Sequence, residues 1–427
     1  MASSRRTFLN RTLMTSSGFL LTGFFQTVAG EQLLSQIDHY QLEEVTTNEE
    51  FWYWVQQAYT VSANIINLNN GGVSPQPKVV QDAVERYNRL SNETPSYYMW
   101  RILDQGREPL RMKLADLAGC SEEEIAINRN ASEALETIIF GLRLKKGEEI
   151  VATKYDYPNM VNAWKQREQR DGVVVKYLDF DLPIENEESI VNQFVSAFTE
   201  RTKVVHITHM INWTGQIMPV KRIAQEAKKR GIEVLVDAAH TFAQLDYKIP
   251  ELECDYLGTS LHKWLCAPFG SGMLYVRKEK IANLYPLFAA PDANSDDIRK
   301  FEHLGTRSFA IEQAIGQAIN FHQMIGSERK EKRLHYLKNY WMERIADLDV
   351  YHSYTSLKPE FACAIALLGT KKKTVRELSD HLFRNYKIHT TTINWEAVNG
   401  VRITPNVYTT TKDLDRLVRA LREFANA

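Results

Sequence analysis

The stretch Val234-Leu-Val-Asp237-Ala-Ala-His240 begins as an apolar, β-branched run and ends in polar residues. Such a run is typical of a short, buried strand in a parallel sheet. The segment before it opens with Pro219 and closes with Gly231, as expected of a helix. A helix that leads into a buried strand ending in a carboxylate predicts an α/β fold, with polar groups gathered at the carboxyl end of the sheet.

The alternation of strands and helices continues on both sides of this stretch. Strands are predicted at residues 125–127, 147–152, 173–178, 203–208 and 272–276, and helices at 132–144, 159–170 and 187–198. This pattern predicts a large domain over 65–305, with a mostly parallel sheet flanked by helices. Two long helical patterns, 310–325 and 328–348, then precede a mixed segment, which predicts a smaller α+β domain over 306–427. Residues 31–64 are expected to pack on that smaller domain.

Composition excludes several classes of protein. The 427 residues carry 52 basic and 53 acidic side chains, a net charge of −1, so no basic surface predicts nucleic-acid binding. The four cysteines are widely spaced without a C-x-x-C motif, which argues against a zinc site or a disulfide framework. No nucleotide-binding glycine motif and no G-x-S-x-G motif occur. No metal site is predicted.

The first 30 residues differ in kind from the rest. Arg5-Arg6 precedes Phe8-Leu9 and an uncharged, moderately apolar stretch over 13–25, and small residues follow at 27–29. The segment resembles a removable twin-arginine export signal, which predicts a periplasmic protein without a stable membrane anchor. The alternative is an ordinary N-terminal segment of a cytoplasmic protein.

A lysine lies shortly after the carboxylate that ends the opening stretch. Ser260-Leu-His-Lys263-Trp264 follows a second short apolar segment, Asp255-Tyr-Leu-Gly258. Pyridoxal 5'-phosphate needs a lysine amine for its Schiff base and an acid, here Asp237, that keeps the pyridine nitrogen protonated. Either residue alone is common in α/β proteins. Their spacing and their neighbours together favour a pyridoxal phosphate site.

On these residues the chain resembles the class V aminotransferase family of fold type I, which includes cysteine desulfurases, kynureninase and isopenicillin N epimerase. The segments around Asp237 and Lys263 are most similar to the isopenicillin N epimerase branch. The resemblance runs from about Asn67 to the C-terminus. It implies an enzyme that acts at Cα of an amino acid substrate, as an aminotransferase or an epimerase. It also implies a homodimer with the active site at the interface.

Three segments are expected to hold the cofactor phosphate. Ala131-Ser132 lies where a strand turns into a helix, and free N–H groups at a helix N-terminus bind anions. The simpler interpretation is that Ser132 only caps the helix. By resemblance, Ser260 is a second phosphate ligand, and Thr306 after Gly305 reaches the phosphate across a dimer interface.

The resemblance also implies contacts to the cofactor ring. Asn212 is expected to bond the phenolic oxygen, although an Asn in a turn is an equally simple explanation. The family needs a flat side chain on the ring, and Tyr157 is the candidate, with Asp156 as the alternative by position. His240 is expected to stack or to steer the strand-end acid. His262 is a candidate proton shuttle.

The substrate side is predicted at two distant segments. Arg402 resembles the family arginine that binds the substrate carboxylate, a task that suits its planar guanidinium. Asn70, in the Asn-Asn-Gly-Gly segment 69–72, is expected beside the substrate, unless the segment is a plain turn. The alternative function is cysteine desulfuration or a lyase reaction, but residues 387–402 contain no cysteine and Cys363 lies in an apolar run. A catalytically silent binding module is the other alternative.

Overall fold

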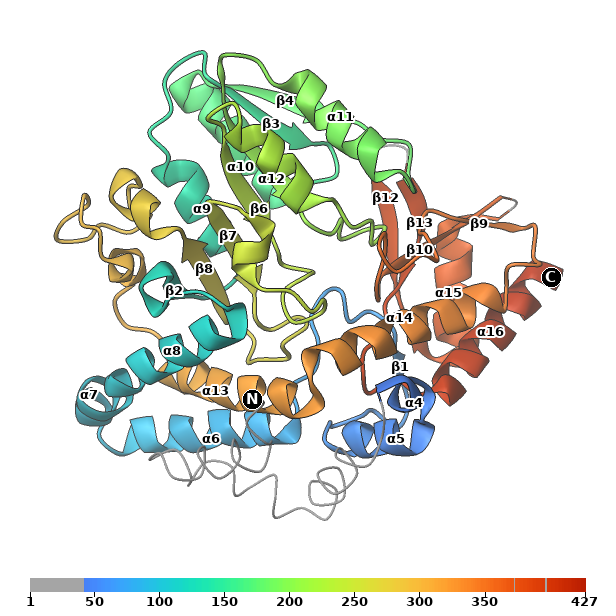
Figure 1. The fold of residues 1–427 in the computed structure, drawn as a ribbon. Helices are drawn as coiled ribbons and strands as arrows, with labels where there is room; N and C mark the ends of the chain where they lie inside the picture. The colour runs from blue at the N-terminus through green and yellow to red at the C-terminus, as the bar shows by residue number, and fades with distance from the viewer. Residues whose placement is uncertain (1–41, 372, 396–397) are drawn as a thin grey trace.

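The computed structural model describes residues 42–371, 373–395 and 398–427. The predicted export signal at 1–30 therefore lies outside the described residues. A large sheet and a smaller one lie side by side, with helices around both (Figure 1). This architecture agrees with the predicted α/β class with a smaller α+β part. The predicted domain limits stay a prediction.

The large sheet has seven strands and six neighbouring pairs, of which four are parallel and two, both involving the same strand, are antiparallel. In sheet order the strands are β2 (Ile125–Asn128), β8 (Gly272–Val276), β7 (Tyr256–Ser260), β6 (Glu233–Asp237), β5 (Thr202–Thr208), β3 (Glu149–Thr153) and β4 (Val174–Leu178). β8 runs antiparallel to both β7 and β2. The chain between β7 and β8 has no room for a crossover helix, so β8 must start at the edge where β7 ends. The connecting loop, which carries Lys263, is thereby kept at the carboxyl edge.

Helices cover both faces of this sheet. α9 (Ala131–Gly141) and α10 (Pro158–Asp171) share one hydrophobic core with alternate strand residues such as Val204 and Leu235. α11 (Glu187–Ala197) and α12 (Val220–Lys228) share another core with the residues between them, such as Val205 and Val234. Successive side chains of a strand point to opposite faces, which explains why consecutive residues such as Val204, Val205, Val234 and Leu235 are all apolar.

The remaining helices lie beside and between the sheets. α6 (Lys78–Glu93) and α8 (Arg107–Ala118) pack on α13 (Phe309–Ile325), and the short α7 (Pro95–Tyr97) lies between α6 and α8 in the sequence. α14 (Ser327–Glu343) packs on α4 (Leu42–Thr47) and is joined to α5 (Glu49–Gln57) by an ion pair. α14 ends at Glu343, several residues before the predicted limit of 348, because the chain turns from Arg344 onward.

The small sheet is antiparallel throughout. Its order is β12 (Thr391–Trp395), β13 (Val398–Ile403), β10 (Ala366–Thr370) and β9 (Tyr351–Ser353). α15 (Val375–Tyr386) and α16 (Thr411–Asn426) pack on each other and share a third core with this sheet. β1 (Ile66–Asn67) pairs in parallel with β11 (Ile388–His389), which brings residues 69–72 beside the end of β13.

The two sheets approach each other closely at one turn. Gly215 has a φ of +77°, and a side chain there would collide with the carbonyl oxygen of Ile365. The backbone N–H of Ile217 donates to the carbonyl of Phe361 at 2.8 Å. The turn after β5 is thus fixed against the segment that leads into β10.

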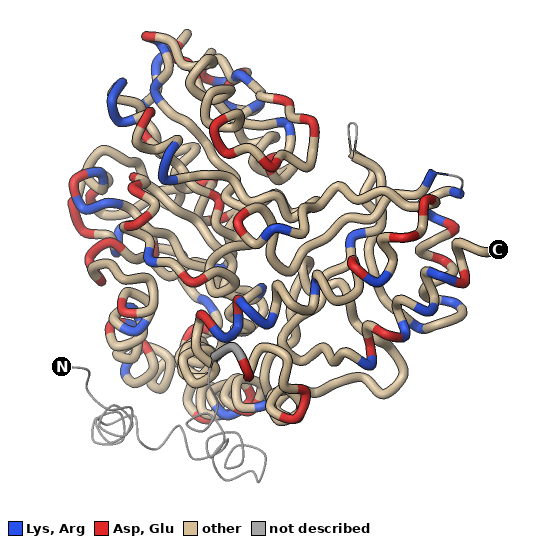
Figure 2. Tube along the Cα trace, turned by 45° about the vertical axis from the view of Figure 1, so that its right-hand side comes forward, with Lys and Arg blue, Asp and Glu red and all other residues tan. Residues whose placement is uncertain are grey.

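Two searches of the described residues give negative findings. Within 42–371, 373–395 and 398–427, no helix is long and apolar enough to cross a membrane. The same part of the chain holds no group of three or more His, Cys, Asp or Glu side chains placed to bind a metal ion. Acidic and basic residues are interspersed along the chain (Figure 2).

Candidate active site

Lys263 and Asp237 lie at the carboxyl edge of the large sheet. Asp237 is the last residue of β6, and Lys263 lies in the loop between β7 and β8. Burial lowers the pKa of Lys263 to about 8, with the Asp237 carboxylate acting to raise it and Arg402 to lower it. Burial raises the pKa of Asp237, whose Oδ1 accepts a 2.9 Å hydrogen bond from the Ala239 N–H. The structure thus brings a reactive amine and a buried acid to one site.

His240 is in direct contact with the lysine. Its Nε2 lies 3.1 Å from Lys263 Nζ, and its Nδ1 accepts a hydrogen bond from the indole N–H of Trp264 at 3.4 Å. Burial and the neighbouring Lys263 and Arg402 hold the pKa of His240 well below its usual range, so the ring is neutral. The structure therefore places His240 against the lysine; its predicted stacking role stays a prediction.

His262 is the residue directly before the lysine. Its Nδ1 lies 3.2 Å from the carbonyl oxygen of Ser271, which accepts only, so this nitrogen carries the proton. Burial lowers the pKa of the His262 ring, leaving Nε2 as an acceptor. This arrangement is compatible with the predicted proton shuttle.

The predicted phosphate turn is assembled from two elements. The backbone N–H of Ala131, the first residue of α9, donates to Ser260 Oγ at 2.9 Å. The helix cap is Asn130, whose side chain accepts from the Glu133 N–H at 2.9 Å, and not Ser132 as the simpler interpretation held. The Ser132 hydroxyl is therefore not needed for capping. Ala131, Ser132 and Ser260 lie together, as the phosphate prediction requires.

Thr306 lies elsewhere on the chain. It is exposed, and it lines a surface cavity with residues from η1 (Tyr98–Leu103), α8 and the segment after β8, among them Trp100, Arg107 and Arg307. None of the other predicted site residues lines this cavity. This cavity gives no support for a contact between Thr306 and the phosphate turn of the same chain, and the role of Thr306 across an interface stays a prediction.

The segments that follow β3 and β5 carry the candidates for ring contacts. Asp156 accepts hydrogen bonds from the N–H and the hydroxyl of Thr153, at 3.0 and 2.9 Å, and from the hydroxyl of Thr208. The Asp156 carboxylate thus links the ends of β3 and β5 by hydrogen bonds. Tyr157, which is 41% exposed, remains the flat side chain available for stacking. The carboxamide oxygen of Asn212 is buried and has no partner among the described residues.

Arg402, on β13 of the small sheet, faces this edge of the large sheet. Its Nη1 donates to the Asn212 carbonyl at 2.8 Å and its Nη2 to Asn69 Oδ1 at 3.0 Å. Its Nε is buried and has no partner among the described residues. Burial lowers the pKa of Arg402 to about 10, and Tyr157 acts to raise it. The guanidinium lies near the predicted ring-stacking residue and keeps one donor free.

Asn70, predicted beside the substrate, has a different environment. Its amide group donates to the carbonyls of Asn67 and Thr404, and its oxygen accepts from the side chains of Asn67 and Tyr408. All four hydrogen-bonding positions of the carboxamide are used within the protein. Asn70 supports the loop, and the neighbouring Asn69 is the residue that contacts Arg402.

Two contacts at the site could not be found from the sequence. Trp264 was noted only as a neighbour of the lysine, but its indole N–H holds His240. His206, on β5, is buried, accepts from the indole N–H of Trp164 at 3.0 Å and acts to lower the pKa of Asp237. Neither contact leaves a signal in spacing, because each joins two segments that are far apart in the sequence.

The residues present fit pyridoxal phosphate. Asp237 is a buried carboxylate whose pKa burial raises, so a protonated pyridine nitrogen would suit it. A side chain at Gly272 would collide with the backbone of Asn130, so β8 lies directly against the phosphate turn. The Asn212 oxygen and Arg402 Nε, which find no partner in the part of the chain that the structure describes, provide polar groups that a ligand can satisfy.

Comparison with known proteins supports the same assignment. The sequence model described as Aminotransferase class-V matches residues 66–417. An isopenicillin N epimerase from Amycolatopsis lactamdurans is 26% identical over 395 residues, which cover 88% of this chain and 98% of that protein.

Solved structures share the fold. The apo cysteine desulfurase from Thermococcus onnurineus NA1 superposes with a TM-score of 0.77 at 21% identity, covering 87% of this chain and 97% of that one. A lysine-to-alanine variant of C-DES, with glycine covalently linked to its PLP cofactor, gives the same score at 18% identity, covering 86% and 98%. The cofactor prediction is confirmed at the level of the family. This chain belongs to the class V aminotransferase family.

Proposed function

We propose that this protein is a pyridoxal-phosphate-dependent enzyme that acts at Cα of an amino acid, as an aminotransferase or as an epimerase similar to isopenicillin N epimerase. One observation carries the proposal. Lys263, whose pKa burial lowers to about 8, and Arg402, whose Nε has no partner within the described part of the chain, face the same edge of the large sheet. An amine for the cofactor and a guanidinium for a carboxylate are thus held at one site.

Each side chain has a separate task in this proposal. Pyridoxal phosphate, when bound, withdraws electrons from the bonds at Cα of the substrate. Asp237 stabilises positive charge at the pyridine nitrogen, and Ala131, Ser132 and Ser260 hold the phosphate. Lys263 takes and returns a proton at its Nζ, which its lowered pKa permits near neutral pH. Arg402 orients the substrate carboxylate, and Tyr157 covers the ring.

The cysteines argue against desulfuration. Persulfide chemistry needs an accessible thiolate. Cys363 is fully buried, and burial raises the pKa of its thiol well above the usual range. Burial also raises the pKa of Cys120 and of Cys254 to about 12, and Cys266 is buried. None of the four thiols in the sequence has the environment of a sulfur nucleophile.

The proposal includes a homodimer. Thr306 is exposed beside Trp100, which is 52% exposed, and Tyr97 and Met112 from neighbouring helices are also largely exposed. Large apolar side chains gathered on a surface are typical of an interface. In a second copy Thr306 would serve the phosphate site across that interface. The predicted export to the periplasm stays a prediction, because its signal lies outside the described residues.

A screen in deuterated water tests the proposed function. The purified protein, loaded with pyridoxal phosphate, is incubated with individual L- and D-amino acids, and deuterium at Cα is measured by mass spectrometry. We expect exchange for at least one amino acid, since both reactions break and remake the Cα–H bond. A 2-oxo acid product identifies transamination, and the opposite enantiomer identifies epimerisation.

The same screen also separates the alternatives. Release of sulfide from cysteine without Cα exchange in other amino acids would favour the desulfurase. Bound cofactor without exchange for any amino acid would favour a silent binding module.

A further inference from the structure

The contacts of Trp264 define where His240 carries its proton. An indole N–H can only donate, so the His240 Nδ1 that it reaches at 3.4 Å must be the acceptor. A neutral imidazole carries one proton, which then lies on Nε2. That nitrogen lies 3.1 Å from Lys263 Nζ. When the Lys263 amine is neutral, the hydrogen bond therefore runs from the His240 Nε2–H to the lone pair of Nζ.

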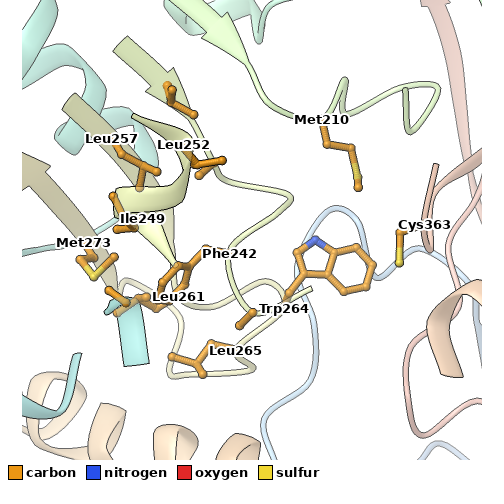
Figure 3. Packing of buried hydrophobic residues seen from close by; sticks show 14 of the residues in the cluster. Met210, Phe242, Ile249, Leu252, Leu257, Leu261, Trp264, Leu265, Met273 and Cys363 are labelled. Carbon is orange, nitrogen blue, oxygen red and sulfur yellow. The ribbon is translucent and has the colours of Figure 1, made fainter. Parts of the chain in front are cut away.

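The surroundings keep this geometry fixed. Trp264 is fully buried, in the same hydrophobic core as Met210 and Cys363, and Figure 3 shows its ring extending from its loop toward Cys363. Its carbonyl oxygen accepts from the ammonium of Lys330, a buried residue of α14. The carbonyl of His240 in turn accepts from the side chain of Gln244. Trp264 and His240 are thus each held by a hydrogen bond to the backbone carbonyl as well as by the hydrogen bond between their rings.

The two histidines next to the lysine have opposite tautomers. His262 donates from Nδ1 to the Ser271 carbonyl, so its Nε2 is an acceptor. His240 accepts at Nδ1 and donates from Nε2. The difference follows from the partner alone, a carbonyl oxygen for one ring and an indole N–H for the other. The indole N–H of Trp264 thus determines which ring nitrogen of His240 carries the proton.

We propose that Trp264 is a positioning residue, whose indole N–H fixes His240 in the Nε2–H tautomer and so makes His240 a hydrogen-bond donor to Lys263. This inference rests on the proposed function in taking Lys263 as the reactive amine. The donated bond favours the neutral amine over the ammonium. It therefore keeps the lysine ready to form its bond with the cofactor and to accept a proton from substrate.

Other charges also act on Lys263 and must be held constant in a test. Asp237 on β6 stabilises the ammonium form, and Arg402 on β13 opposes it. His240 faces Lys263 and Arg402, while Asp237 also faces His206 and Asp156. A substitution at Trp264 leaves all of these groups in place, so a change in the lysine reports the lost indole N–H.

The experiment measures the reactivity of Lys263 in the full-length protein after removal of the cofactor. Brief acylation with an N-hydroxysuccinimide ester is followed across the pH range, and modified Lys263 is quantified by peptide mass spectrometry. In the wild type we expect a midpoint at a pH of about 8. In Trp264→Phe the imidazole is free to reverse its tautomer and accept from the ammonium. The midpoint should then rise by about one pH unit, which lowers acylation at pH 8 about fivefold.

Two further variants separate the hydrogen bond from packing. Replacement of Trp264 by 3-benzothienylalanine keeps the shape of the ring but puts sulfur in place of the N–H, and it should give the same rise. Trp341→Phe is the matched control, because Trp341 is also fully buried but its indole nitrogen has no partner among the described residues. Its midpoint should stay that of the wild type.

The outcomes are distinct from those of the substrate screen, since acylation requires no turnover. An unchanged or lower midpoint in the benzothienylalanine protein would overturn the proposal. An equal rise in Trp341→Phe would do the same, because it would assign the effect to loosened packing.

Discussion

The cofactor side and the substrate side of the site are built in different ways. The cofactor side comes from one edge of one sheet, where Asp237 ends β6 and the loop after β7 carries Lys263. The substrate side needs two sheets, because Arg402 on β13 is held by the carbonyl of Asn212 and by Asn69. Those partners lie 190 and 333 residues from Arg402 in the sequence.

This difference separates two kinds of function. The cofactor side is local to the large sheet, so it is expected to form whenever that sheet folds. Arg402 depends on the docking of the small sheet, and its position can differ between relatives without disturbing the cofactor. Family members with different substrates are therefore expected to differ on the substrate side first.

The largest effect is expected from Lys263→Ala. This variant loses both the amine that bonds the cofactor and the group that moves the proton, so kcat should fall by about a thousandfold or more. Cofactor should still bind through the phosphate turn, measured by ultrafiltration. Borohydride reduction should label Lys263 in the wild type and leave no label at this position in the variant. Turnover near the wild-type rate would show that the lysine has been misassigned.

A smaller effect is expected from Arg402→Ala, which removes the carboxylate partner but leaves the cofactor side intact. A charge-assisted hydrogen bond contributes about 1.5–3 kcal/mol, so kcat/KM for amino acids should fall by roughly ten- to a hundredfold. The absorbance of the bound cofactor should not change.

Amines without a carboxylate provide the control for Arg402. Their rates should be nearly equal in the variant and the wild type. An equal loss for both kinds of substrate would mean that Arg402 supports the fold of the site instead of binding the carboxylate.

The smallest effect is expected from Cys363→Ala. The thiol is fully buried in a hydrophobic core and serves packing, so turnover should change less than about twofold, with a stability loss of about 1 kcal/mol. Activity and thermal unfolding are measured together. If the wild type released sulfide from cysteine and the variant did not, the desulfurase alternative would return.

The sequence indicates the position of the cofactor side more directly than that of the substrate side, for a physical reason. Apolar runs reveal strands wherever they lie, and the carboxyl end of each strand indicates the edge where Asp237 and Lys263 meet. The reversed direction of β8 leaves no such signal, because a buried strand is apolar in either direction.

The roles of single residues are harder to predict from the sequence where two neighbouring residues have similar side chains. Asn130 and Ser132 are both good helix caps, and only the backbone conformation shows that Asn130 is used. Asn69 and Asn70 are identical in type, and only hydrogen bonds to distant residues show that Asn69 holds Arg402. The tautomer of His240 likewise depends on a contact between two loops.

The close approach at Gly215 has a consequence for genetic studies of this protein. The backbone at Gly215 is left-handed, and any side chain there would also collide with the Ile365 carbonyl. Every other amino acid is therefore disfavoured for two separate reasons. In a library of all single substitutions, position 215 should tolerate glycine alone, regardless of the polarity or size of the replacement. Its selection profile would look like that of Lys263, although a glycine has no side chain to take part in the chemistry.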